Sequence, residues 1–228
     1  MKIYGMEKLS LVDFDGKIAT TLFTGSCNFR CGFCHNSPLV LDVNKLPYIP
    51  ETEIFSFLTQ RQGIIEGVCI SGGEPTLCND LPEFCAKIKA LGYPIKLDTN
   101  GTNPKMLETL VKEKLIDYVA MDIKNSPEGY AKTAGTEVDM DAVGESVRYL
   151  LSGAVDYEFR TTVVKGYHTE ADFQSIGRWI KGANAYFIQC FKDSGDIIEK
   201  GLEKPEEIEV FAFLEAVKPY VPNAQIRG

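Results

Sequence analysis

Short apolar runs alternate with longer amphipathic stretches along the chain. The runs are four to seven residues long, and continuous short apolar segments are typical of strands buried on both faces of a parallel sheet. Most of them are followed by a stretch whose apolar residues recur with the period of a helix. The pattern predicts six strands, over residues 18–23, 67–70, 94–97, 118–121, 158–164 and 185–190.

Residues that favour helix ends support this alternation. Asp80 precedes the amphipathic stretch 81–91, which ends before a glycine, and we expect its side chain to cap that helix. Asn103 stands directly before Pro104, an N-cap followed by proline at the first helical position. Thr169 is expected to open a further helix, and Pro205 to start the last one.

Six strand-then-helix units predict an α/β fold, a parallel sheet or partial (βα)6 TIM-like barrel. Before the first unit, residues 10–20 are expected to form an N-terminal β-hairpin that turns at residues 13–16. We find no internal repeat, low-complexity tract or linker, so residues 1–228 are treated as a single domain. Polar clusters at 27–36, 71–75, 98–101 and 122–124 follow the first four strands, where the loops of such folds carry reactive groups.

Composition narrows the class of protein. Hydrophobic residues make up 44% and charged residues 25% of the chain, as in globular proteins. The net charge of −8 disfavours binding to nucleic acid, which would need a basic surface. No apolar run approaches the roughly 20 residues of a membrane span, and the first 16 residues lack the pattern of a signal peptide. We therefore expect a cytoplasmic protein with a protein or small-molecule partner.

Three of the seven cysteines fall within eight residues, at Cys27, Cys31 and Cys34. In a reducing compartment, closely spaced thiols indicate metal ligands, and thiolates are the usual ligands of iron–sulfur clusters. Three ligands would leave one iron of a [4Fe–4S] cubane open for a substrate. Two alternatives remain: buried cysteines without a metal, and a zinc site with His35 as the fourth ligand.

The spacing Cys27-x₃-Cys31-x-Phe33-Cys34 resembles the signature of the radical S-adenosylmethionine superfamily. Ser71-Gly72-Gly73-Glu74-Pro75 resembles its second motif, in which glycines let the backbone approach the methionine amino group. The resemblance implies one [4Fe–4S] cluster, held by the three cysteines, that cleaves S-adenosylmethionine to a 5′-deoxyadenosyl radical.

Within the superfamily, the chain most resembles the activating enzymes of glycyl-radical enzymes, particularly anaerobic ribonucleoside-triphosphate reductase activating proteins. The resemblance is carried by Asp98-Thr99-Asn100-Gly101, Met121-Asp122-Ile123-Lys124 and the Cys34-His35-Asn36 end of the cysteine loop. It implies an oxidoreductase whose partners are a glycyl-radical enzyme and a flavodoxin or ferredoxin that supplies electrons.

The same resemblance implies a set of site residues. A monovalent cation would be held by Asp98, Thr99, Asp122 and the Met121 carbonyl group, and would offset repulsion between the acidic side chains and the cofactor carboxylate. For the two aspartates, a helix cap or turn is the alternative. The cofactor would contact Phe33, Asn36, Gly72, Gly73, Glu74, Asp98, Asn100, Asp122, Lys124 and Arg160. For Arg160, a salt bridge inside the barrel is an equal alternative, and His35 and Asn36 are candidates for contacts with the partner.

The chain departs from related activating enzymes after the last predicted strand. Some relatives place a histidine there, near the ribose, whereas this chain has Gln189 and Cys190. We interpret Cys190 as a packed thiol. Cys78 and Cys85 do not form the closely spaced groups that an additional cluster would need, so a single cluster is expected.

The sequence therefore predicts an activating enzyme that places a glycyl radical on anaerobic ribonucleoside-triphosphate reductase. Three alternatives stay open. They are activation of another glycyl-radical enzyme such as pyruvate formate-lyase, a radical reaction on a small molecule, and a non-catalytic iron–sulfur electron carrier or zinc scaffold.

Overall fold

The computed structural model describes residues 1–193 and 195–227. Its contacts group the chain into two compact units. Unit 1 comprises Met1–Asn28, Pro38–Thr99 and Asn103–Val119, and unit 2 comprises Phe29–Ser37, Asn100–Thr102 and the chain from Ala120 onward. Each unit is described by itself.

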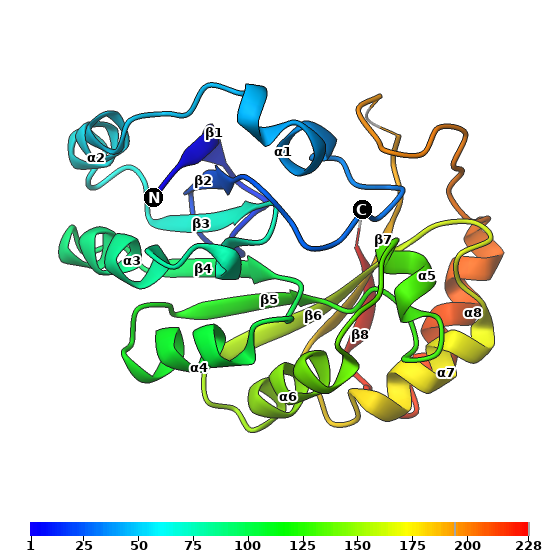
Figure 1. The fold of residues 1–228 in the computed structure, drawn as a ribbon. Helices are drawn as coiled ribbons and strands as arrows, with labels where there is room; N and C mark the ends of the chain where they lie inside the picture. The colour runs from blue at the N-terminus through cyan, green and yellow to red at the C-terminus, as the bar shows by residue number, and fades with distance from the viewer. Residues whose placement is uncertain (194, 228) are drawn as a thin grey trace. The chain divides into compact units, whose positions relative to one another are not determined.

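Eight strands follow one another through the sheet in chain order, β1 to β8 (Figure 1). They are β1 (Ile3–Ser10), β2 (Ala19–Thr24), β3 (Gly67–Gly72), β4 (Ile95–Thr99), β5 (Tyr118–Asp122), β6 (Asp156–Val163), β7 (Tyr186–Cys190) and β8 (Ala224–Arg227). The predicted α/β class is confirmed: a mostly parallel sheet is preceded by an antiparallel hairpin. Each of the six predicted strands is present, with ends shifted by at most two residues.

Eight α-helices and two short 3₁₀ helices lie in the described chain. The α-helices are α1 (Ser37–Leu41), α2 (Glu51–Gln60), α3 (Leu81–Ala90), α4 (Pro104–Lys112), α5 (Tyr130–Ala134), α6 (Met140–Leu151), α7 (Glu170–Trp179) and α8 (Glu207–Val217). The 3₁₀ helices are η1 (Val43–Lys45) and η2 (Pro75–Leu77).

The N-terminal strands of unit 1 form the predicted hairpin. β1 and β2 pair antiparallel, with Glu7 opposite Thr21, and the chain turns where the Lys17 N–H donates to the Phe14 carbonyl O at 3.0 Å. Gly16 has φ +73, a conformation that suits glycine at this turn. β1 begins earlier than we predicted. Only its end residues, Ile3 and Ser10, are buried, so the strand lacks the apolar pattern by which the others were predicted.

The rest of unit 1 is a parallel sheet with a fully buried apolar centre. Leu22 of β2 lies opposite Ile70 of β3, and Ile70 lies opposite Leu97 of β4. All three side chains have no exposed surface. This register brings the carboxyl ends of β2, β3 and β4, and the polar residues that follow them, to the same edge of unit 1.

Unit 2 has its own parallel sheet and helix pair. Ile188 of β7 lies between Thr161 of β6 and Ile226 of β8. Helices α7 and α8 pack through Phe173 and Phe213, whose rings stack with centroids 4.5 Å apart. The strand β8 was not predicted, since it is four residues long and only Ala224 is buried.

The helix-end predictions had mixed outcomes. The Asn103 side chain accepts from the Met106 N–H at 3.2 Å, and Thr169 forms a capping box with Asp172, so both predicted caps are confirmed. Two predictions were wrong. Asp80 makes no cap bond and pairs with the chain's N-terminal amine at 2.9 Å instead. The last helix begins at Glu207 rather than at proline, because Glu206 forms the capping box.

Candidate active site

The cysteine loop leaves β2 and crosses from unit 1 to unit 2. Cys27 lies in unit 1 and is half-buried, whereas Cys31 and Cys34 lie in unit 2. Cys31 is buried and Cys34 is half-buried, and their segment turns tightly because the Cys34 N–H donates to the Cys31 carbonyl O at 3.0 Å. None of the three thiols is in a disulfide. Burial raises the pKa of the Cys31 thiol, against the nearby Lys124 ammonium group, which lowers it.

The glycine turn after β3 packs directly on the chain that leads into the cysteine loop. A Cβ atom on Gly73 would lie 1.9 Å from the Ser26 carbonyl O, and one on Gly72 would lie 2.4 Å from the Thr24 O. Hydrogen bonds fix the same approach: the Gly73 N–H donates to Thr24 O at 2.9 Å and the Glu74 N–H to Ser26 O at 2.8 Å. The glycines therefore serve a close backbone contact within unit 1, a role our sequence interpretation did not foresee.

Glu74 is buried, with 1% of its surface exposed, and its carboxylate is bonded within the protein. Its Oε1 atom accepts from the Thr76 N–H at 3.1 Å, the Thr76 hydroxyl at 2.5 Å and the Thr99 hydroxyl at 2.8 Å. These bonds join the turn after β3 to the end of β4. Thr99, which we predicted as a cation ligand, donates its hydroxyl hydrogen here.

Asp98, the neighbouring predicted ligand, accepts from the Ser71 hydroxyl at 3.0 Å. Its Oδ1 atom lies 3.4 Å from the Lys96 ammonium nitrogen, which also donates to the Asp13 carbonyl O at 2.6 Å. Hydrogen bonds between polar side chains thus link the carboxyl ends of β3 and β4, through Ser71 and Asp98 and through Glu74 and Thr99.

Unit 2 contains a second acidic group, held between two cations. Asp122 Oδ2 lies 2.9 Å from the Lys124 Nζ atom, and Asp122 Oδ1 lies 3.0 Å from the Arg160 Nε atom. Burial would raise the pKa of Asp122, but the two cations outweigh it and lower the pKa to about 2. The Lys124 pKa is raised, since the charges of Asp122 and Cys31 outweigh the effect of burial. Arg160 thus takes part in a salt bridge with Asp122, and its contact with the cofactor stays a prediction.

The remaining predicted residues of unit 2 have mainly local partners. Asn100 Oδ1 accepts from the Thr102 N–H and hydroxyl, at 3.0 and 2.7 Å. Gly101 has φ +76, and a Cβ atom there would lie 2.0 Å from the Met121 Cε atom, so Met121 packs on this turn. Phe33 is buried, 6.0 Å from the Lys124 ammonium nitrogen, and its ring is therefore close to that charge.

Two other cysteines behave as packed thiols. Burial raises the pKa of Cys85 to about 12 and that of Cys78 to about 11, values at which both stay protonated at neutral pH. Gln189 and Cys190 are half-buried at the end of β7.

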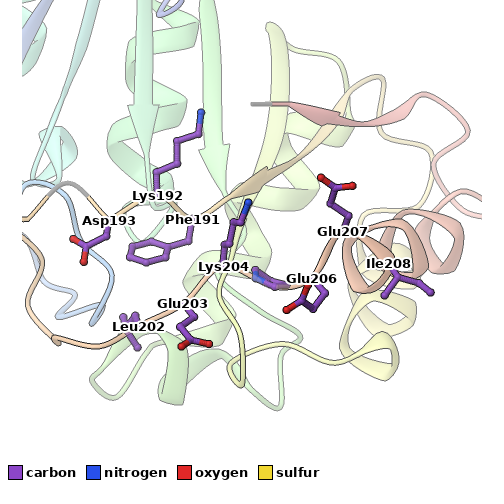
Figure 2. A pocket seen from close by; sticks show the side chains of 10 residues that line it. Phe191, Lys192, Asp193, Leu202, Glu203, Lys204, Glu206, Glu207 and Ile208 are labelled. Atoms are coloured by element: carbon purple, nitrogen blue, oxygen red, sulfur yellow. The ribbon is translucent and has the colours of Figure 1, made fainter.

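A groove of about 780 Å³ in unit 2 was not predicted from the sequence. Figure 2 shows it, with the ammonium groups of Lys192 and Lys204 pointing to the same side. Its lining comes from the loop after β7 and the start of α8: Phe191, Lys192, Asp193, Leu202, Glu203, Lys204, Pro205, Glu206, Glu207 and Ile208. No sequence motif falls on these residues. The groove forms because the loop after β7 brings two separate stretches of the chain together, which the sequence pattern does not reveal.

The chain belongs to the radical SAM superfamily, which matches residues 21–180. Its relatives include a protein of Methanocaldococcus jannaschii named "putative glycyl-radical enzyme activating enzyme", 33% identical over 99% of this chain and 95% of that protein. A "probable GTP 3′,8-cyclase" of Thermococcus kodakarensis is 31% identical over 68% of this chain, which covers 52% of that protein. The crystal structure of Streptococcus suis SuiB has the same fold, with a TM-score of 0.70 over 92% of this chain, 16% identity and 49% of SuiB covered.

Membership of this superfamily implies a [4Fe–4S] cluster and S-adenosylmethionine. The cysteine loop offers three thiols outside disulfides, and thiolates are the usual ligands of such a cluster. No helix among the described residues is long and apolar enough to cross a membrane.

Proposed function

We propose that this protein is an oxidoreductase that activates a glycyl-radical enzyme, with anaerobic ribonucleoside-triphosphate reductase as its partner. The observation that carries the proposal is the end-to-end match with the M. jannaschii relative, which spans 99% of this chain and 95% of that protein. The GTP cyclase relative, in contrast, has about half of its length outside the match. The proposal therefore follows the relative that matches along nearly all of this chain.

In this proposal Cys27, Cys31 and Cys34 ligate the cluster. When bound and reduced, the cluster would supply the electron for reductive cleavage of S-adenosylmethionine to methionine and a 5′-deoxyadenosyl radical, the species that would take a Cα hydrogen from a glycine of the partner. The protein's own contribution is to bind the cofactor, to orient it toward the partner's glycine and to exclude water from the site. A flavodoxin or ferredoxin supplies the electron.

The remaining site residues would bind the cofactor. The proposed contacts are those of Phe33, Asn36, Gly72, Gly73, Glu74, Asp98, Asn100, Asp122, Lys124 and Arg160. A monovalent cation at Asp98, Thr99, Asp122 and the Met121 carbonyl remains part of the proposal. Since Lys124 and Arg160 balance the charge of Asp122 and Lys96 lies 3.4 Å from Asp98, the cation would chiefly offset the charge of the cofactor carboxylate.

The radical reaction is tested by anaerobic reconstitution with iron and sulfide, chemical reduction, addition of S-adenosylmethionine and an assay for 5′-deoxyadenosine. Wild type should form the product, and Cys31→Ala should not. Cys190→Ala is the matched control, because this half-buried cysteine lies outside the loop and should leave product formation unchanged. No product from a wild-type protein that holds one reduced cluster per chain would refute the enzyme proposal.

The substrate is tested by offering two candidates to the active protein. With anaerobic ribonucleoside-triphosphate reductase, we expect electron paramagnetic resonance to detect a glycyl radical that disappears when the partner's radical glycine is changed to alanine. Pyruvate formate-lyase is tested in the same way. A glycyl radical formed on it, and not on the reductase, would identify pyruvate formate-lyase as the class of partner. Consumption of GTP without a protein radical would instead favour the small-molecule alternative.

A further inference from the structure

The loop after β7 folds back over the cysteine loop within unit 2. We call residues 196–203 the strap. The Ser37 hydroxyl donates to the Asp196 carbonyl O at 2.6 Å, and the Lys165 N–H donates to the Glu203 carbonyl O at 3.0 Å. Ile197 is buried, with 8% of its surface exposed. The strap is therefore anchored near both ends and packed against the unit.

The centre of the strap is bonded to the backbone between two of the cysteines. The Glu199 N–H donates to the Gly32 carbonyl O at 2.8 Å. The Glu199 carboxylate in turn accepts from the Tyr167 hydroxyl at 2.5 Å. Gly32 stands between Cys31 and Cys34, so this contact acts on the part of the loop that sets the separation of those two thiols.

The fit over Gly32 leaves no room for a side chain. A Cβ atom there would lie 2.6 Å from Glu199 Oε2 and 2.8 Å from the Tyr167 hydroxyl O. The Tyr167 ring also meets the Phe33 ring edge-on, with centroids 6.0 Å apart. Tyr167 thus lies against two successive residues of the loop: its hydroxyl group, which is bonded to Glu199, lies over Gly32, and its ring packs on Phe33.

The loop is held from a second side as well. The Arg30 N–H donates to the Ala134 carbonyl O at 2.7 Å, and a Cβ atom on Gly135 would lie 2.3 Å from the Arg30 O. With this side fixed by backbone contact to α5, the Glu199–Tyr167 pair closes the opposite side. Removing the side-chain pair would leave the Glu199 N–H bond to the Gly32 carbonyl group without the side-chain contact that supports it.

We propose that Tyr167 and Glu199 are positioning residues that hold the cysteine loop at Gly32 and so help Cys31 and Cys34 to retain the cluster they would ligate. This inference rests on the proposed function, in which those cysteines ligate the cluster. Groups that orient metal ligands are commonly worth 10- to 100-fold in metal affinity. Because Glu199 is an exposed residue and its contact is partly screened, we expect an effect of roughly fivefold, about that of one hydrogen bond.

The test measures iron retention without S-adenosylmethionine or substrate. Reconstituted protein is diluted anaerobically into an iron chelator, and the rate of iron loss is followed. Tyr167→Phe keeps the ring but removes the hydroxyl, and Glu199→Gln keeps the size but removes the charge. Each should lose iron roughly fivefold faster than wild type. The matched control is Glu215→Gln, an exposed glutamate paired with Lys218 at 2.9 Å on α8, which should behave as wild type.

A double variant separates this positioning role from a general loss of stability. Because both substitutions break one contact, Tyr167→Phe combined with Glu199→Gln should lose iron no faster than either alone. Gly32→Ala should push the pair away and be equally non-additive with Glu199→Gln. Thermal unfolding of the iron-free chains should be nearly unchanged. Rates equal to those of Glu215→Gln, or fully additive effects, would overturn this positioning role, whereas a wild type that never binds a cluster would overturn the proposed function itself.

Discussion

His168 links the end of β6 to the segment that carries Lys124, and its replacement should loosen both. The ring is buried, with 6% exposed. Its Nδ1 atom accepts from the Val164 N–H at 3.3 Å, so Nε2 carries the hydrogen and donates to the Lys124 carbonyl O at 2.9 Å. His168→Phe would keep the ring against Phe173, whose centroid is 6.0 Å away, but would lose both hydrogen bonds.

The expected cost follows from the two backbone groups that lose their partner. A buried hydrogen bond contributes about 1 to 1.5 kcal/mol net, so His168→Phe should lower the free energy of unfolding by roughly 2 to 3 kcal/mol. Urea denaturation of the iron-free protein at pH 8 measures this difference. His168→Gln, which can donate or accept one of the bonds, should recover part of it. A loss below about 0.5 kcal/mol would refute the assignment of both bonds, since that is the range of ordinary surface substitutions.

The same pair of proteins tests the protonation state of His168. Burial lowers its pKa, outweighing the neighbouring backbone carbonyl and the charge of Asp172, which raise it. The unfolded chain therefore takes up a proton at higher pH than the folded chain, and wild type loses stability as pH falls below about 6.5. The phenylalanine variant lacks this group, so the stability gap between the two proteins should narrow between pH 8 and pH 5.5. A gap that stays constant or widens would contradict the lowered pKa.

Two further predictions concern the glycine turn after β3. Gly73→Ala should lower the free energy of unfolding by roughly 3 kcal/mol or abolish folding, because the added Cβ atom would lie 1.9 Å from the Ser26 carbonyl O. Thermal unfolding and calorimetric measurement of S-adenosylmethionine binding would show this loss. A fully stable variant would contradict it. Glu74→Gln should cost about 1 to 3 kcal/mol in urea denaturation, because the charge that accepts from Thr76 and Thr99 is lost in a buried position; unchanged stability would argue against this role.

The sequence predicted the parallel core of the fold well, because buried strands are short apolar runs whose length and spacing need no knowledge of tertiary contacts. The full length of β1 and the whole of β8 were missed for the opposite reason: these strands lie at the two ends of the strand order, and their residues are partly exposed. Asp80 shows a different limit. Its residue type is suited to capping a helix, but its carboxylate instead forms an ion pair at 2.9 Å with the N-terminal amine, a partner far away in the sequence.

The motifs predicted the residues of the candidate site but not the structural role of each one. Glu74 and Asp122 both fall in motifs attributed to cofactor binding, yet each carboxylate has bonds within its own unit. The glycines at 72 and 73 were assigned to a close approach by the cofactor, and the structure shows a close approach by the chain itself. A motif records which residue types occur together. It cannot distinguish a side chain that touches a ligand from one that shapes the loop that does.

The contacts that fix the site are largely contacts to backbone groups, made by residues outside every motif. Glu199 bonds the carbonyl side of Gly32 through its N–H, and His168 bonds the carbonyl group of Lys124. Such anchors do not constrain the identity of the residue they hold, so motif matching has no means of finding them. A variant with every motif residue intact should therefore still lose iron when Tyr167 or Glu199 is changed, and lose stability when His168 is changed.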